Sequence, residues 1–181
     1  MKQINLANVS EASDSKRPTA GAYCCIIRNV EDIADREYLK ITYDIHSGEF
    51  KGYYDELRAN HPDWGWCGAY VRSYKPAALG MFKRFCSAVS NSNGGYVFDA
   101  GNVNADEKTL IGKVVGLVFQ EEEYYGNDGE KKTRLIVNKE FPYTSEKDLA
   151  TQRIPSIKRL KEEAPARSDF VSVANVGEIP F

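Results

Sequence analysis

The stretch from Leu110 to Glu140, LIGKVVGLVFQEEEYYGNDGEKKTRLIVNKE, carries the clearest structural pattern in the chain. Its first part, residues 110–122, is a long apolar run typical of a buried β-strand. Two glycines inside this run suggest bends of the kind found where a barrel turns a corner. Residues 125–129 (YGNDG) are typical of a hairpin turn, and residues 131–140 return as a second strand. The stretch therefore predicts a two-stranded hairpin.

Three segments upstream of this hairpin have the composition of strands. Residues 21–30 (GAYCCIIRNV) are continuously apolar in the middle, which indicates a buried strand. Residues 38–45 (YLKITYDI) alternate with period two, as in a strand with one exposed face. Residues 50–57 (FKGYYDEL) are predicted to continue as a strand. The aromatic, glycine-interrupted residues 63–74 (DWGWCGAYVRSY) are expected to form a loop that leads into another strand.

One helix is predicted between these strands and the hairpin. Pro76 opens a segment whose apolar residues recur at three- and four-residue steps, the spacing of one helix face, and SNSNGG at 90–95 ends it. Two or three strands, one helix and a final hairpin follow the order of the OB-fold. We therefore predict a mainly β domain at residues 20–144, a five-stranded OB-fold barrel with one helix between strands 3 and 4.

Both ends of the chain are polar and lie outside the predicted domain. Residues 1–19 are predicted to be a flexible leader, without the apolar segment of a secretory signal. Residues 145–181 are predicted to be a flexible tail with a short helix at 157–163. No apolar run reaches the roughly 18 residues that a membrane helix needs, so we expect no membrane partner.

Overall composition argues against a simple basic nucleic-acid binder. The 181 residues carry 24 Lys and Arg against 26 Asp and Glu, a formal net charge of −2, whereas phosphate binding needs local positive charge. The four cysteines include no C-x-x-C pair, and the chain has two histidines. Buried, reduced thiols of a cytosolic protein are therefore expected instead of a structural zinc site.

No catalytic arrangement is evident in the sequence. His46 lies in a predicted turn and His61 precedes a proline, and neither phosphate-loop motif, G-x-x-x-x-G-K or G-x-G-x-x-G, occurs after a strand. The run Glu121–Glu123 favours a solvated strand end, although a metal-dependent nuclease that uses these carboxylates remains a third hypothesis. We expect no enzyme activity, no catalytic residue, no cofactor and no bound metal.

The charge is distributed unevenly along the chain. Residues 131–161 carry nine basic and three acidic side chains, whereas residues 28–63 carry five basic and nine acidic ones. Residues 70–84 add four basic side chains and no acidic one. Near-neutrality thus conceals two basic segments that a polyanion could contact.

Aromatic side chains are interleaved with these basic residues. Single-stranded nucleic acids bind to cationic grooves in which bases stack on exposed rings. The predicted stacking residues are Trp64, Trp66, Tyr70 and Tyr74. The predicted phosphate contacts are Arg72, Lys75, Lys131, Lys132 and Arg134.

The last four residues, Glu178-Ile179-Pro180-Phe181, combine negative charge with an apolar anchor, as in a short peptide ligand for a basic pocket. This ending is similar to the acidic tip of bacterial single-stranded DNA-binding proteins, which closes with Ile-Pro-Phe and recruits replication and repair partners. The bacterial tip has several aspartates, whereas here only Glu178 adjoins the apolar end. Residues 109–135 resemble phage-encoded single-stranded DNA-binding proteins with an OB-fold, a similarity that covers roughly residues 19–144.

The resemblance implies a phage protein that binds single-stranded DNA without sequence preference in DNA replication, recombination and repair, in the cytoplasm of the host cell. It also implies that Glu178, Ile179, Pro180 and Phe181 bind partner proteins. The alternative is an OB-fold protein-interaction module of a phage replication or recombination complex that binds no DNA. The sequence leaves open whether the protein forms a homo-oligomer and whether it prefers DNA or RNA.

Overall fold

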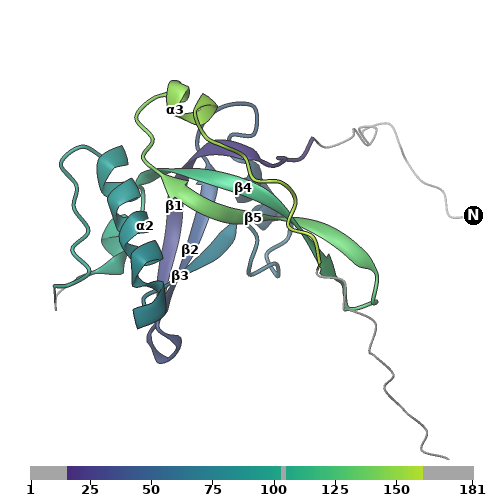
Figure 1. Ribbon diagram of the computed structural model, residues 1–181, viewed down its shortest axis with the longest axis horizontal. Coiled ribbons are helices and arrows are strands. Elements are labelled where there is room, and N and C mark those ends of the chain that lie inside the picture. The colour runs from purple at the N-terminus through teal and green to yellow at the C-terminus, as the bar shows by residue number, and fades with distance from the viewer. Residues whose placement is uncertain (1–15, 103–104, 161–181) are drawn as a thin grey trace, which may run out of the picture.

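The computed structural model describes residues 16–102 and 105–160, and its centre is a five-stranded antiparallel sheet (Figure 1). Within the sheet the strands lie in the order β3-β2-β1-β4-β5, so β3 and β5 are its two edges. The mainly β prediction is confirmed, and the sheet is not closed by strand pairing into a barrel. The strands are β1 (Gly21–Ile33), β2 (Tyr38–Ile45), β3 (Ala69–Ser73), β4 (Val114–Tyr125) and β5 (Lys131–Phe141).

The principal helix, α2 (Leu79–Ser92), lies between β3 and β4 in the chain, as predicted, and packs beside the sheet (Figure 1). Its apolar face contributes Phe82, Phe85 and Val89 to the core. Two further α-helices and three short 3-10 segments are described: α1 (Tyr53–Asn60), α3 (Glu146–Ala150), η1 (Ala34–Arg36), η2 (Pro76–Ala78) and η3 (Glu107–Leu110). No helix of the described residues is long and apolar enough to cross a membrane.

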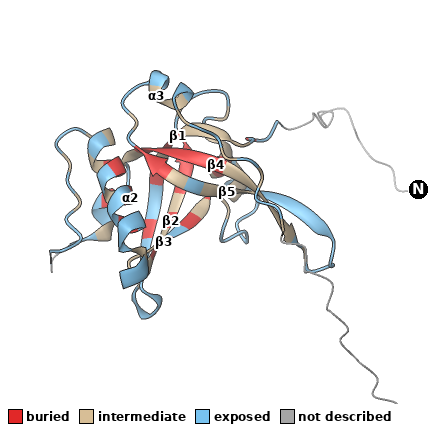
Figure 2. Cartoon of the chain, viewed as in Figure 1, coloured by how far each residue is buried: buried red, intermediate tan, exposed pale blue. Residues whose placement is uncertain are grey.

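The core lies between α2 and one face of the sheet, and β1, β2 and β4 each contribute buried residues to it (Figure 2). Ile27 of β1 and Phe119 of β4 are fully buried there. Gly116 allows β4 to pass close to the end of β5, because a Cβ atom at this position would lie 2.4 Å from the ring of Phe141. The glycine from which a bend was predicted therefore lies at a tight contact between strands.

The strand predicted at residues 50–57 is wrong, because these residues form a turn and the start of α1. Gly52 has φ +83°, a left-handed conformation that ends any extended backbone. The carboxylate of Asp44 then accepts a hydrogen bond from the Tyr54 backbone N–H at 2.9 Å, which satisfies a donor at the start of the helix. The third strand is the short segment β3 (Ala69–Ser73), inside the region where a strand was expected to follow a loop.

Part of the predicted tail lies against the sheet instead. Residues 151–160, which we call the C-terminal strap, follow α3, and Lys158 of the strap forms a parallel bridge with Glu122 of β4. The Lys158 N–H donates to Glu121 O at 2.8 Å, and the Glu123 N–H donates to Lys158 O at 2.9 Å. Residues 157–160 are therefore not helical, contrary to the predicted helix. The leader residues 1–15 and the tail residues 161–181, with the tip Glu178–Phe181, lie outside the described residues.

Candidate nucleic-acid interface

A groove of about 1310 Å³ runs along the open side of the sheet, between the two edge strands. One side is formed by the loop at residues 63–68, which we call the tryptophan loop, together with β3. The other side is formed by residues 133–137 of β5 and by Tyr124 of β4. The far half of the β4–β5 hairpin extends beyond β1, which pairs with β4 only as far as Phe119 (Figure 1).

The tryptophan loop presents two exposed indole rings. Trp64 and Trp66 are 53% and 60% exposed. The ring of His61 stacks on Trp64, with the ring centroids 4.0 Å apart and the planes 8° from parallel. The Lys40 Nζ atom lies 4.8 Å from the ring centroid of Trp66. Each indole therefore contacts one side chain of the protein, and more than half of its surface remains exposed for stacking.

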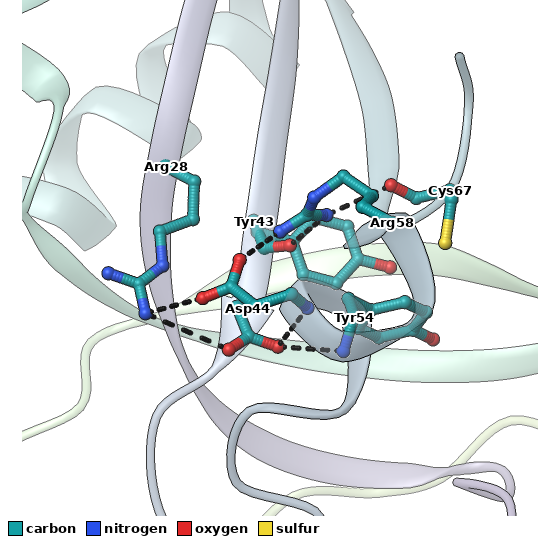
Figure 3. A network of polar contacts seen from close by, with 7 residues as sticks. Arg28, Tyr43, Asp44, Tyr54, Arg58 and Cys67 are labelled. Carbon is teal, nitrogen blue, oxygen red and sulfur yellow. Dashed lines mark hydrogen bonds and ion pairs between the residues drawn. The ribbon is translucent and has the colours of Figure 1, made fainter. Parts of the chain in front are cut away.

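Arg58 of α1 fixes the base of the tryptophan loop. Its Nη1 atom donates to the carbonyl oxygens of Tyr43 and Cys67, both at 3.0 Å, and so ties α1 to β2 and to the end of the loop (Figure 3). Gly68 has φ +60°, and a Cβ atom there would lie 2.7 Å from Arg58 Nη1 and 2.8 Å from the Tyr54 side chain. Only glycine fits this close approach. The contacts of the loop with α1 therefore require a glycine at position 68.

A buried carboxylate, Asp44 of β2, supports the same helix. It is 1% exposed and lies between Arg28 and the first turn of α1 (Figure 3). Arg28 Nη2 is 3.8 Å from Asp44 Oδ2, and Tyr54 N–H donates to Asp44 Oδ1. Burial raises the pKa of Asp44, because it disfavours the charged form. This network positions α1, and through Arg58 the tryptophan loop.

Arg134 provides the cationic group on the hairpin side of the groove. Its guanidinium carbon lies 5.0 Å from the ring centroid of Tyr124, and its Nη2 atom is 2.7 Å from Glu122 Oε2. More than half of the Arg134 side chain is exposed. Arg134 donates from both Nε and Nη2 to Glu122 Oε2, and the Glu122 side chain is only 13% exposed. The carboxylate therefore holds the guanidinium in place at the groove.

The predicted site residues divide into two groups. The structure brings Trp64, Trp66, Tyr70, Arg72 and Arg134 together as lining of the groove. Outside the lining lie the other four predicted residues, Tyr74, Lys75, Lys131 and Lys132.

Tyr70 and Arg72 belong to the interior and not to the exposed surface. They are 9% and 7% exposed, and the Arg72 guanidinium lies 4.7 Å from the Tyr70 ring centroid. The Arg72 Nε–H donates to the buried carboxylate of Glu140. Stacking by Tyr70 and phosphate contact by Arg72 would therefore require these side chains to leave their present partners.

The four residues outside the lining also have distinct surroundings. Tyr74 donates a hydrogen bond to Asp32 at 2.8 Å, and its ring packs against Phe82. Lys75 is exposed and forms no ion pair with the described residues. The remaining two lysines are paired: Lys131 with Glu123 at 2.9 Å, and Lys132 with Asp128.

Two residues of this interface were not found by sequence reasoning. Tyr124 lies in the run EEEYYG, where the three glutamates and not the tyrosines were considered as candidate site residues. The hairpin register pairs Glu122 with Arg134 and Tyr124 with Lys132, so period-two alternation along β4 could have placed Tyr124 beside Arg134. Lys40 could not be found, because its contact with Trp66 depends on the path of the loop.

Glu122 and Glu123 of the glutamate run form ion pairs with basic side chains. Glu122 contacts Lys158 and Arg134, and hydrogen bonds from these two side chains lower the pKa of Glu122. A hydrogen bond from Lys131 likewise lowers the pKa of Glu123. Among the described residues, no group of three or more His, Cys, Asp or Glu side chains could hold a metal ion.

No protein-family model matches this chain, and no curated protein matches it. The groove is therefore the feature from which function is inferred. It combines two exposed indoles with a guanidinium that lies on the half-buried ring of Tyr124.

Proposed function

We propose that this protein binds single-stranded DNA without strong sequence preference, in the groove between the tryptophan loop and the β4–β5 hairpin. The observation that carries the proposal is the placement of Trp64 and Trp66 opposite Arg134 in one open groove. Bases that are not paired can stack on the indoles, and the backbone can contact the guanidinium. Every base has a π-face, so a surface of this kind tolerates any sequence.

The strand order supports the finer proposal of an OB-type barrel. OB-folds are partly open five-stranded barrels that bind oligonucleotides through strands 2 and 3 and the loops between strands 1 and 2 and between strands 4 and 5. In this protein β3 and the β4–β5 hairpin border the groove. The contact between Arg72 of β3 and Glu140 of β5 lies where such a barrel would close.

A role in phage DNA replication, recombination and repair in the host cytoplasm remains part of the proposal, together with recruitment of partner proteins by Glu178–Phe181. These four residues lie outside the described part of the chain, so their role is tested by deletion. A chain that ends at Gly177 should keep its affinity for DNA and lose affinity for replication or recombination proteins. If deletion weakens DNA binding itself, the proposed role of the tip is wrong.

The second candidate is a protein-interaction module that binds no DNA. The observation that favours it is the pairing of Lys131, Lys132 and Arg134 with neighbouring carboxylates, which neutralises much of the basic hairpin. Binding of fluorescently labelled oligo-dT, measured by anisotropy at low salt, separates the two candidates. We expect saturable binding that weakens steeply with salt and that an equal length of duplex DNA does not compete away. Absence of binding at low salt would favour the interaction module.

A further inference from the structure

A second hollow, of about 570 Å³, lies where β5 meets the C-terminal strap. It contains two basic side chains and no carboxylate. Its lining residues are Asn138, Lys139, Arg153, Ile154, Pro155 and Ser156.

Lys139 and Arg153 differ from the other basic residues of this region. The hairpin and strap cations Lys131, Arg134 and Lys158 each contact a glutamate. Lys139, which is half-buried, and Arg153, which is exposed, form no ion pair with any described residue. Two like charges in one hollow without a neutralising carboxylate are favourable for an anionic ligand.

The side chain of Gln120 connects the two walls of the hollow. Gln120 of β4 donates from Nε2 to the Ser156 carbonyl oxygen of the strap at 2.7 Å. Its Oε1 atom accepts a hydrogen bond from Asn138 Nδ2 of β5 at 2.8 Å. The strap is therefore fixed relative to β5, and the two cations are brought together by the fold.

The hollow continues the groove along the same edge strand. Residues 133–137 of β5 line the groove, and Asn138 and Lys139 line the hollow. Successive residues of a strand advance by about 3.3 Å, so the two features are neighbours on β5. A polynucleotide that crosses the edge of the sheet at the end of the groove therefore meets Lys139, which pairs with Val118 just after the register shift of the hairpin.

We propose that Lys139 and Arg153 form a phosphate-binding site for the backbone of the single strand as it leaves the groove. This inference rests on the proposed function and extends the binding surface beyond the aromatic residues. Arg153 can contact phosphate oxygens with a planar guanidinium, and Lys139 provides a point charge. Ile154 and Pro155 provide apolar surface beside the two cations.

The test compares two double variants that remove the same charge. Lys139→Gln/Arg153→Gln alters the hollow, whereas Lys51→Gln/Lys108→Gln removes two exposed lysines that line neither the groove nor the hollow. Affinity for a long oligo-dT is measured as a function of salt for both variants and for the wild type. Thermal unfolding of each variant establishes that it is folded under the binding conditions.

For single strands each phosphate contact contributes about −0.7 to the slope of log affinity against log salt. Loss of two contacts should therefore make the slope of the hollow variant shallower by about 1.4 than that of the wild type. This difference is about sevenfold less loss of affinity between about 50 and 200 mM salt. The control variant should keep the wild-type slope.

The outcomes distinguish this inference from the proposed function. Equal slopes for the hollow variant and the control variant would overturn the phosphate site while leaving DNA binding by the groove in place. A wild type that does not bind oligo-dT would overturn both. A shallower slope for the hollow variant alone would support the phosphate site.

Discussion

The guanidinium of Arg72 in β3 donates to the carboxylate of Glu140 in β5, an ion pair that joins the two edge strands of the sheet. Both side chains are buried, at 7% and 2% exposure. Arg84 of α2 adds a second cation, with its Nε atom 3.9 Å from Glu140 Oε2. The two edges are thus connected by side chains, although no strand pairing between them is present in the described residues.

Replacement of Glu140 by alanine should strongly destabilise the protein, because it leaves the buried Arg72 guanidinium without its partner. Breaking a buried pair in this way costs about 3–5 kcal/mol. Urea unfolding would measure the change in the free energy of unfolding. Glu49→Ala is the matched control, since Glu49 pairs with Lys16 on the surface and such pairs contribute about 0–1 kcal/mol. A similar small loss in both variants would show that the buried pair does not stabilise the sheet.

Gly68→Ala should destabilise the protein and weaken DNA binding together. The left-handed backbone and the contacts with Arg58 and Tyr54 leave no room for a Cβ atom, so the tryptophan loop must move. The cost should exceed about 1 kcal/mol. Gly65→Ala in the same loop is the control, because a Cβ atom there meets nothing within 4 Å. If Gly68→Ala has the same stability and the same DNA affinity as Gly65→Ala, the loop is not fixed at this position.

Acid should weaken the contact between the C-terminal strap and β4. Hydrogen bonds from Lys158 and Arg134 lower the pKa of Glu122 in the folded protein. A lowered folded-state pKa stabilises the protein above the ordinary glutamate pKa of about 4.3, and this stabilisation is lost as the pH falls toward the lowered value.

The variant Glu122→Gln tests this pH dependence. Its free energy of unfolding should be below that of the wild type at neutral pH, and the two should converge as the pH falls below about 4. Glu130→Gln is the control, since the exposed Glu130 side chain forms no ion pair with the described residues. A gap between the wild type and Glu122→Gln that persists at low pH would contradict the explanation.

Removal of the indole rings should reduce affinity for single-stranded DNA. Stacking of a base on an aromatic side chain contributes about 1–3 kcal/mol, so Trp64→Ala and Trp66→Ala should each weaken binding by about 5- to 150-fold. Tyr125→Ala is the matched control, because Tyr125 is 66% exposed and does not line the groove. Equal losses in all three variants would show that general surface aromaticity, and not the groove, determines affinity.

The elements that the sequence predicted correctly are those with local patterns. The β4–β5 hairpin follows from an apolar run, a glycine-rich turn and a returning strand, and α2 follows from Pro76 and its apolar spacing. The start of α1 could not be predicted, because it depends on the side chain of Asp44 from another strand. The β-propensity of Tyr53 and Tyr54 instead favoured a strand at these residues.

The burial of Tyr70 and Arg72 could not be predicted from their neighbours in the chain. Both lie in a strand of five residues, AYVRS, between the glycine-containing tryptophan loop and the exposed Lys75, a setting that suggests an exposed surface. Their interior position depends on Glu140, which follows Arg72 by 68 residues. Trp64 and Trp66, in contrast, lie among glycine and aspartate residues in a loop, and their exposure agrees with that composition.

Intrinsic tryptophan emission during titration with oligo-dT tests the central claim most directly. The chain contains two tryptophans, and both line the groove, so any change in emission reports on the proposed site. We expect saturable quenching at low salt that is reversed by added salt, because base stacking quenches the indoles and salt weakens phosphate contacts. Unchanged tryptophan emission at saturating oligo-dT and low salt would contradict binding of single-stranded DNA in this groove.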